Sequence, residues 1–468
     1  MKKVVVIGTG VGGSAISAIL SKNGFDVSVL ERNKFAGGKT ASYERDGFIC
    51  DMGVHSSPSG EKGPIGIAAQ MVGAEIKFLS TDPIAYFFIG EKTATIPLNL
   101  VSPTSLLKMV WLSDVKFKNL FGAMLLFLKI LRKQGKKTFD KYQGVSFRDF
   151  FLKHSEDKGL YGFLEAFAVL MFVMPSSESC AAEFIKSFAP FARNKATGYP
   201  KGGYRQVPLS FLDVCKKNNG TVKLDEPVQK VRIEDGNVTG VETKNGFYPA
   251  DIVVSNAGIR KTIEMTGEEH FTENYLKWAS KLKDSYSAVT VKYALDYQPM
   301  TELVGLSIRK NYSFDKDIEQ LNNGIIPKNL MLYITCPTAV DSGVAPKGKH
   351  LLLAGTPVPD GLSSEIIEGI LDRIEEQMET LYPGLEDHII WKHRTNLEYG
   401  NLMGGRGAAE AIGLAQSVGQ TGKSKPNPRM PVKGLYIVGC DAGGIGVGTE
   451  QAADSAINVS NIIINEKR

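Results

Sequence analysis

Three glycines near the start of the chain have the spacing that binds the diphosphate of a dinucleotide. Gly8, Gly10 and Gly13 follow the G-x-G-x-x-G pattern, in which the first glycine permits a tight turn, the second lets the backbone approach a pyrophosphate, and the third lets a helix pack closely on a strand. Glu31 lies 18 residues after Gly13, where a carboxylate accepts the ribose hydroxyls and disfavours a 2′-phosphate. These residues predict a site for an adenosine diphosphate group.

The elements around these glycines must hold them in that geometry. Residues 4–7 read VVVI, a run typical of a buried parallel strand, and residues 12–23 predict the helix whose first amides hold the phosphate. Residues 27–30 predict a second strand that ends at Glu31. The glycine pattern alone is weak evidence, but strand, helix, strand and terminal glutamate together are strong.

A second glycine pair follows in residues 33–40, NKFAGGKT. Placed so soon after the ribose carboxylate, it predicts another backbone loop against the diphosphate or the ribityl chain, to which Lys39 adds a positive charge. The alternative is an ordinary Gly-Gly turn with a solvated lysine. Residues 434–444, GLYIVGCDAGG, form another strand ending in glycines more than 400 residues later, which suggests one site built from both ends of the chain.

Chain length, net charge and cysteine spacing exclude several classes of protein. A chain of 468 residues exceeds the usual size of one core, so we expect two interleaved domains. The net charge of +5 is too small to indicate nucleic-acid binding. The five cysteines are scattered without metal or redox spacing, and the first strand starts too early for a signal peptide. We therefore expect a reduced, cytoplasmic protein without a metal site.

The motifs together resemble the phytoene desaturase and carotenoid isomerase family of flavin enzymes, within the superfamily of flavin amine oxidases. The similar segments are residues 4–40, YPKGGY at 199–204, PVQKV at 227–231, ADIVVSNAG at 250–258, APKGKH at 345–350 and the glycine-rich segment from residue 434. The resemblance implies a two-domain α/β fold of the glutathione-reductase type, with a Rossmann-like FAD domain and an interleaved substrate domain of mixed sheet and helices. It also implies FAD as cofactor and an apolar isoprenoid or polyene as substrate.

The resemblance also implies how the chain is divided and which residues contact FAD. Residues 1–80, 196–262 and 401–468 correspond to the FAD domain, residues 81–195 to a helical substrate-binding or membrane-facing segment, and residues 263–400 to the sheet and helices of the substrate domain. The cofactor residues that it implies are Gly8, Gly10, Gly12, Gly13, Glu31, Arg32, Gly37, Gly38, Lys39, Thr40, Val228, Asn256, Ala257, Gly258, Asp441, Gly443, Gly444 and Gly446.

Asp441 resembles an acidic residue that bonds the ribityl or pyrophosphate region, although a helix N-cap is the alternative. The last helix, at about 447–463, is expected to direct its N-terminus at the flavin's pyrimidine edge. Since the cofactor carries the hydride chemistry, few acid or base side chains are expected. His55 is the best polar candidate for catalysis, and a structural histidine is its alternative. Arg406 and Gln416 either line the same cavity or are surface residues.

Residues 104–137 combine eight Lys or Arg with one Asp and four large aromatic side chains. No apolar run in them is long enough to span a bilayer. Such a segment is typical of docking on an anionic membrane surface, where a hydrocarbon substrate would be dissolved. The alternative is a helical layer with an apolar inner side and a solvated face of lysines.

Several functions compete on this sequence. Desaturation, isomerisation and saturation of a polyene differ in electron flow and in no motif of the chain. An amine or porphyrinogen oxidase is a second candidate, but residues 402–435 and 437–468 contain no Phe, Tyr or Trp, which counts against an aromatic cage for a cationic amine. A non-catalytic flavin- and lipid-binding protein is the candidate from another class. No feature of the sequence selects an oligomeric state.

Overall fold

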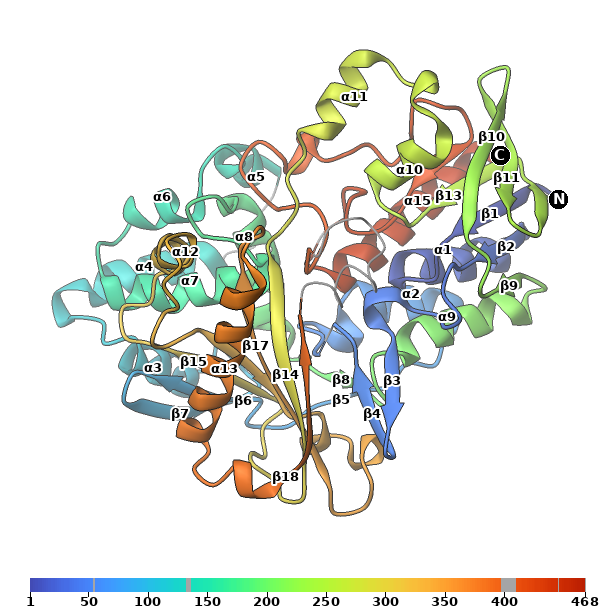
Figure 1. The fold of residues 1–468 in the computed structure, drawn as a ribbon. Helices are drawn as coiled ribbons and strands as arrows, with labels where there is room; N and C mark the ends of the chain where they lie inside the picture. The colour runs from blue at the N-terminus through green and yellow to red at the C-terminus, as the bar shows by residue number, and fades with distance from the viewer. Residues whose placement is uncertain (54, 132–135, 397–409, 445, 468) are drawn as a thin grey trace.

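The computed structural model describes residues 1–53, 55–131, 136–396, 410–444 and 446–467. Two large sheets dominate it, and Figure 1 shows them on opposite sides of the molecule, with both chain ends on the side of the smaller one. That sheet has five parallel strands in the order β19 (Leu435–Ile437), β13 (Ile252–Ser255), β1 (Lys3–Ile7), β2 (Asp26–Leu30) and β9 (Thr221–Lys223). Strands from distant parts of the chain therefore lie next to each other.

The side chains of β1 point alternately to the two faces of the sheet, and both faces are buried. Val4 and Val6 belong to one apolar cluster with side chains of helices α1 (Val11–Lys22) and α15 (Thr449–Lys467). Val5 and Ile7 belong to another cluster on the opposite face. A strand covered on both faces must be apolar throughout, as residues 4–7 are. Helices α9 (Gln206–Lys217) and α2 (Pro64–Val72) also pack beside α1.

The opposite face of the parallel sheet is covered by a small antiparallel sheet. Its strands are β10 (Val228–Glu234), β11 (Asn237–Thr243) and β12 (Gly246–Pro249). The alternating segments 227–233 and 238–242 around Asp235-Gly236-Asn237 predict a hairpin. The structure contains it, with Asp235 and Gly236 between β10 and β11, both at positive φ. Helices α10 (Ile259–Thr266) and α11 (Glu273–Ser280) follow β13, and Ile259 packs into the same cluster as Val5.

The second sheet has seven strands in mixed directions. Their order is β18 (Ile389–Thr395), β14 (Ser287–Leu295), β17 (His350–Val358), β16 (Leu332–Thr335), β15 (Val304–Ile308), β6 (Ala85–Ile89) and β7 (Lys92–Ile96). Val289, Val291 and Tyr293 of β14 pack in one cluster with helix α13 (Ser364–Leu381). The alternate side chains of β14 face the other way, toward the interior between the two sheets.

A group of helices covers the inner side of the seven-stranded sheet. They are α3 (Pro103–Leu112), α4 (Leu120–Leu131), α5 (Lys136–Tyr142), α6 (Phe147–Leu152), α7 (Lys158–Phe172), α8 (Ala181–Asn194) and α12 (Phe314–Asn322). Two short ribbons, β3 (Ser42–Arg45) with β4 (Phe48–Asp51) and β5 (Phe78–Leu79) with β8 (Tyr199–Pro200), lie near the base of the molecule in Figure 1.

Candidate functional site: two cavities that meet

The turn after β1 is possible only with glycine. Gly8 has φ +92°, and its N–H donates to the carbonyl of Leu30 at 2.8 Å. A Cβ on Gly13 would lie 2.1 Å from the carbonyl oxygen of Gly8, far inside van der Waals contact. The first turn of α1 therefore packs directly against the end of β1, as the glycine spacing predicts.

The start of α1 faces a cavity of about 440 Å³ that Gly8, Gly10, Val11 and Gly12 help to line. Gly10 is the N-cap of α1, no side chain caps the helix, and its first turn contains no acidic residue. The first amides of a helix need an acceptor, and an anion is favoured there by the helix dipole. The cavity thus fits a bound pyrophosphate at this point.

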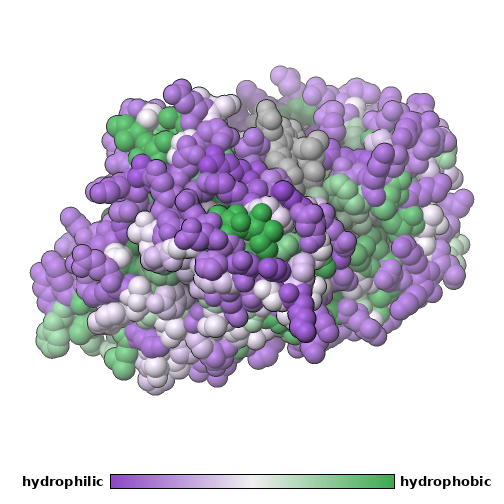
Figure 2. Space-filling view, turned by 60° about the horizontal axis from the view of Figure 1, so that its bottom comes forward, coloured by the Kyte–Doolittle hydropathy of each residue, from purple (hydrophilic) through white to green (hydrophobic). Residues whose placement is uncertain are grey.

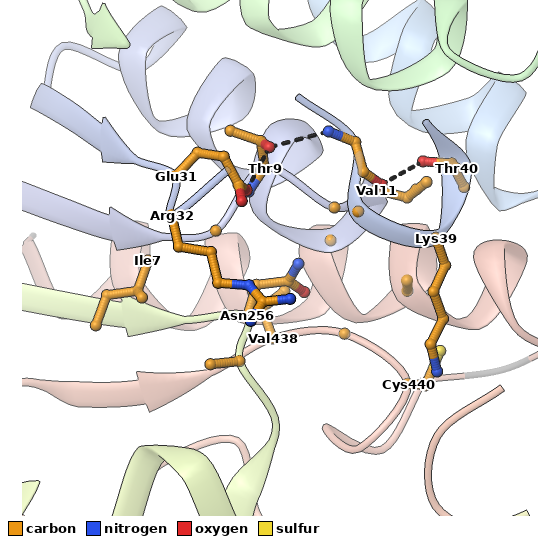
Figure 3. A pocket seen from close by; sticks show the side chains of 18 of the residues that line it. Ile7, Thr9, Val11, Glu31, Arg32, Lys39, Thr40, Asn256, Val438 and Cys440 are labelled. Carbon is orange, nitrogen blue, oxygen red and sulfur yellow. Dashed lines mark hydrogen bonds between the residues drawn. The ribbon is translucent and has the colours of Figure 1, made fainter. Parts of the chain in front are cut away.

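Glu31 links the two glycine-containing loops of this cavity (Figure 3). One oxygen of its buried carboxylate, Oε2, accepts hydrogen bonds from the amide of Thr9 at 2.9 Å and from its Oγ1 at 2.6 Å. The Thr9 hydroxyl oxygen in turn accepts from the amide of Gly37 at 3.0 Å. Glu31 and Arg32 both line the cavity, at the opposite end from Lys39 in Figure 3.

The loop of the second glycine pair also lines this cavity. Gly37 and Gly38 have φ values of +112° and +54°, and a short 3-10 turn runs from Gly38 to Thr40. The Lys39 ammonium forms an ion pair of 2.8 Å with Glu410, whose side chain is fully buried. The charge of Lys39 is therefore offset by a carboxylate that the sequence did not single out, because it lies 371 residues away.

Residues from the far end of the chain complete the same cavity. Val228, Asn256 and Ala257 line it, and so do later residues that include Gly439, Cys440, Gly448, Thr449 and Ala452. The amide of Asn256 fills the space beside three glycines, because a Cβ on Gly10, Gly12 or Gly439 would lie 2.6 to 2.7 Å from it. The two ends of the chain thus meet around one cavity, as the paired motifs suggest.

Other predicted cofactor residues do not line this cavity. Gly258 caps α10 with φ +85°. The buried Asp441 accepts hydrogen bonds from the amides of Ile259 at 3.0 Å and Leu414 at 3.4 Å. It therefore accepts a hydrogen bond from the first amide of α10. Gly443, Gly444 and Gly446 precede α15 without lining either cavity, so their contact with the cofactor and that of Asp441 stay predictions.

A second cavity of about 310 Å³ adjoins the first, and Ala411, Ile412, Gly448 and Thr449 line both. Its wall is mostly apolar and comes from strands of the large sheet and from helices α7 and α8. The polar side chains in the wall are His55, Ser56, Thr197, Thr290, Tyr333, Thr356 and Thr449. Among the described residues that line it, none is Asp, Glu, Lys or Arg. A charged ligand would therefore find no ion-pair partner among the described residues that line this cavity.

His55 lies in the wall of this second cavity and is buried. Burial lowers its pKa to about 3, and the charge of Lys292 contributes in the same direction. The imidazole is therefore neutral at physiological pH, with a nitrogen able to accept a proton or a hydrogen bond. The segment after β4 therefore contributes to the wall of this cavity, and the catalytic role of His55 stays a prediction.

Lys292 is a residue that the sequence analysis missed. It is buried on β14, on the same face as the cavity residue Thr290, and desolvation lowers its pKa to about 8. The signal for it is a lysine at an inward position of YSAVTVKYALDY, an otherwise apolar strand. Gln416 is buried, but its amide donates to the carbonyl of Leu414 at 3.2 Å and it lines neither cavity. Arg406 lies outside the described residues.

The sequence model of flavin containing amine oxidoreductases matches residues 15–464 of this chain. The chain belongs to that family. Its relatives include the zeta-carotene-forming phytoene desaturase of Myxococcus xanthus, which is 24% identical over 94% of this chain and 89% of its own length. Another is the chloroplastic prolycopene isomerase of Daucus carota, which is 23% identical over 83% of this chain and 68% of its own length.

Two solved structures share the fold. An oxidoreductase from Methanosarcina mazei has a TM-score of 0.77 at 22% identity, with 98% of this chain and 100% of that chain covered. A putrescine oxidase bound to putrescine has a TM-score of 0.68 at 15% identity, with 100% and 98% covered. At these identities the likeness establishes the fold alone. Family and fold confirm an FAD-dependent oxidoreductase of mixed α/β architecture.

Proposed function

We propose that this protein oxidises, isomerises or saturates an apolar isoprenoid or polyene. The observation that carries the proposal is the second cavity. Its wall is mostly apolar, the described residues in it include no charged side chain, and it adjoins the glycine-lined cavity at Thr449. Bound FAD supplies the hydride-transfer chemistry. The protein supplies a dry, apolar wall that orients a hydrocarbon and the neutral imidazole of His55 as acceptor for a released proton.

The relatives support the same substrate class. Those named phytoene desaturase and prolycopene isomerase match most of this chain. The family also contains an amine oxidase, and four aromatic side chains line the cavity from the large sheet and the helices, namely Phe87, Phe167, Phe191 and Tyr333. Aromatic faces alone suit a cation as well as a polyene, but a diamine also needs a carboxylate for its distal ammonium, and none lines the described wall.

An anaerobic reduction experiment tests the proposal. The flavin-loaded protein is mixed without oxygen with isoprenoids of several chain lengths, with amines and with porphyrinogens, and bleaching of the flavin absorbance is followed. We expect an isoprenoid to bleach the flavin, and amines and porphyrinogens to leave it oxidised. Reduction only by amines or only by porphyrinogens would overturn the assignment. Conversion of a cis polyene without net bleaching indicates isomerisation, and reoxidation of prereduced flavin by a polyene indicates saturation. A flavoprotein that binds isoprenoids without reaction in either flavin state belongs to the non-catalytic class.

We further propose that helix α4 docks this enzyme on an anionic membrane surface. Ala123, Leu126 and Ile130 bury one face of α4 in the core. Its outer face is apolar too, because Phe121, Met124, Leu125 and Leu128 are between 48% and 68% exposed. This arrangement differs from a helical layer with an outer face of solvated lysines, and large exposed apolar patches mark interaction sites.

The neighbouring residues fit the same interpretation. Phe117 is 89% exposed between the exposed Lys116 and Lys118, and Leu107 and Trp111 of α3 are exposed as well. Figure 2 shows apolar side chains at the left end of the molecule, where Figure 1 places the turn between α3 and α4. Exposed aromatic side chains flanked by lysines suit the interface of an anionic bilayer. No helix within the described residues is both long and apolar enough to cross a bilayer.

Vesicle binding tests the docking surface. Wild-type protein is expected to co-sediment with vesicles of phosphatidylcholine and phosphatidylglycerol, and less with phosphatidylcholine alone or at high salt. The double variant F117S/F121S should lose about 10-fold or more in affinity, because burial of each ring contributes about 1.5 kcal/mol or more. The control variant F247S removes a ring that is 51% exposed on β12 and should bind like wild type. Equal binding by all three proteins would contradict the proposal.

A further inference from the structure

Glu450 is a buried carboxyl group beside the residue that joins the two cavities. It lies in the first turn of α15, directly after Thr449, which lines both cavities. Only 2% of Glu450 is exposed. The sequence analysis did not single it out, because a glutamate in the first turn of a helix is ordinary and favourable on the surface. Burial makes it unusual here.

Two hydrogen bonds join this carboxylate to the loop that forms part of the apolar cavity. The hydroxyl of Ser57 donates to Oε1 at 2.5 Å, and the amide of Ile65 donates to Oε2 at 3.1 Å. The loop closes so tightly that a Cβ on Gly63 would lie 2.6 Å from Oε2. Since His55 and Ser56 of the same loop line the apolar cavity, Glu450 holds that wall against the start of α15.

The carboxyl group has no cationic partner in the described part of the chain, where no Lys, Arg or His forms an ion pair with it. Ser57 and Ser59, which face it from the loop, are neutral. The titratable group packed beside it is the buried phenol of Tyr204, whose pKa is raised well above its usual value by burial and by the charge of Glu450. Burial also raises the pKa of Glu450 to about 7, so its charge changes near neutral pH.

We propose that Glu450 takes up a proton from solvent when the adjacent flavin is reduced and returns it on reoxidation. The step adds H⁺ to the carboxylate and removes it again, and no electron passes through Glu450. Reduction adds negative charge to the site, and two like charges in a buried environment repel more strongly than in water. Protonation of Glu450 removes that repulsion. This inference rests on the flavin site and is independent of the substrate.

The midpoint potential of the bound flavin, measured electrochemically without substrate from pH 5 to pH 9, tests the proposal. The variant E450Q is permanently neutral. We expect its potential to match that of wild type at low pH and to lie increasingly above it as the pH rises through about 7. The matched control is E61Q, which neutralises an exposed glutamate of the same loop and should follow wild type at every pH. A gap between wild type and E450Q that does not change with pH would overturn the proposal.

Two further measurements keep the test decisive if E450Q does not retain flavin. The reduced-minus-oxidised infrared spectrum of wild type should contain the C=O band of a newly protonated carboxyl group, and the E61Q spectrum should contain the same band. In S57A the carboxylate loses a hydrogen bond that lowers its pKa, so proton uptake on reduction should persist to higher pH. Absence of the infrared band from the wild-type spectrum would overturn the proposal, whatever the results for the variants.

Discussion

The two cavities that meet at Thr449 are built in different ways. The glycine-lined cavity takes its shape from the backbone, because turns at positive φ and missing side chains create the space. The apolar cavity takes its shape from side chains of several strands and helices. A substitution that adds one carbon atom can block the first cavity, whereas the second can accept an apolar side chain of similar volume.

This difference indicates which part of the site can change its substrate specificity. The cofactor cavity has to fit one constant molecule, and several of the glycines that shape it, such as Gly10, Gly12 and Gly13, leave no room for a Cβ. The apolar cavity carries the choice of substrate in side chains that can be exchanged while the fold remains. The following four variants test this contrast, from the largest expected effect to the smallest.

Gly13→Ala should have the largest effect. The added Cβ would lie 2.1 Å from the carbonyl oxygen of Gly8, so the turn must open, and we expect FAD affinity to fall about 100-fold or more. The ratio of flavin to protein after purification measures this loss. The control is Gly38→Ala in the second loop, where a Cβ meets nothing within 4 Å and only backbone strain at φ +54° is expected. Equal flavin loss in both variants would contradict the expectation that the clash at Gly13 causes the loss.

His55→Ala is expected to affect the other cavity alone. If the neutral imidazole accepts the released proton, the rate of flavin reduction by the isoprenoid should fall about 100-fold. The flavin content should stay unchanged, because His55 does not line the glycine-rich cavity. Thr356→Val is the matched control in the same wall. A normal reduction rate with a lowered unfolding temperature would assign His55 a structural role.

Glu450→Gln is expected to alter the pH dependence of stability. The pKa of Glu450 is about 7 in the folded protein and 4.5 in the reference state, so the folded state binds the extra proton between these values. Wild-type stability therefore falls as the pH rises from 4.5 to 7, by at most about 3 kcal/mol, and stays lower above pH 7. The variant should lack this fall. Urea unfolding of both proteins at pH 5 and pH 8 measures it, and identical pH profiles would contradict the expectation.

Tyr333→Phe should have the smallest effect. The partly buried Tyr333 hydroxyl is hydrogen-bonded to Ser56 in the wall of the apolar cavity. Its loss should cost about 1 kcal/mol of stability. Because the ring is kept, the chain-length preference for isoprenoids should remain. Phe167→Ala, which empties ring volume from the same wall, should change that preference and serves as the positive control. A changed preference in Tyr333→Phe would show that polar groups also select the substrate.

The sequence predicted the nucleotide side of the molecule well. The β1 turn, Glu31 and the second glycine pair all line or shape one cavity, since local geometry requires those residue types at that spacing. The turn residues Asp235 and Gly236 likewise predict the hairpin that the structure contains. Helix α15, however, begins at Thr449, two residues later than expected, because Gly446 and Gly448 just before it have positive φ.

The apolar cavity could not be predicted in the same way. Its wall comes from β6, α7, α8 and the strands β14 to β17, and each contributes ordinary apolar residues that would serve equally in a core. Only His55 was singled out from the sequence. Lys292, Glu410 and Glu450 were missed because burial, which distinguishes them from surface charges, depends on the tertiary arrangement.

The placement of β19 beside β13, and of β13 beside β1, has a consequence for biosynthesis. The ribosome completes the glycine turn after β1 early, but Gly439, Cys440 and Thr449, which close the same cavity, are translated more than 400 residues later. At about 5 to 20 residues per second, the nascent chain waits roughly 20 to 80 s for its final strand. FAD loading is therefore a late event in the maturation of each molecule, and a ribosome stalled before β19 holds a chain whose cofactor cavity is still open.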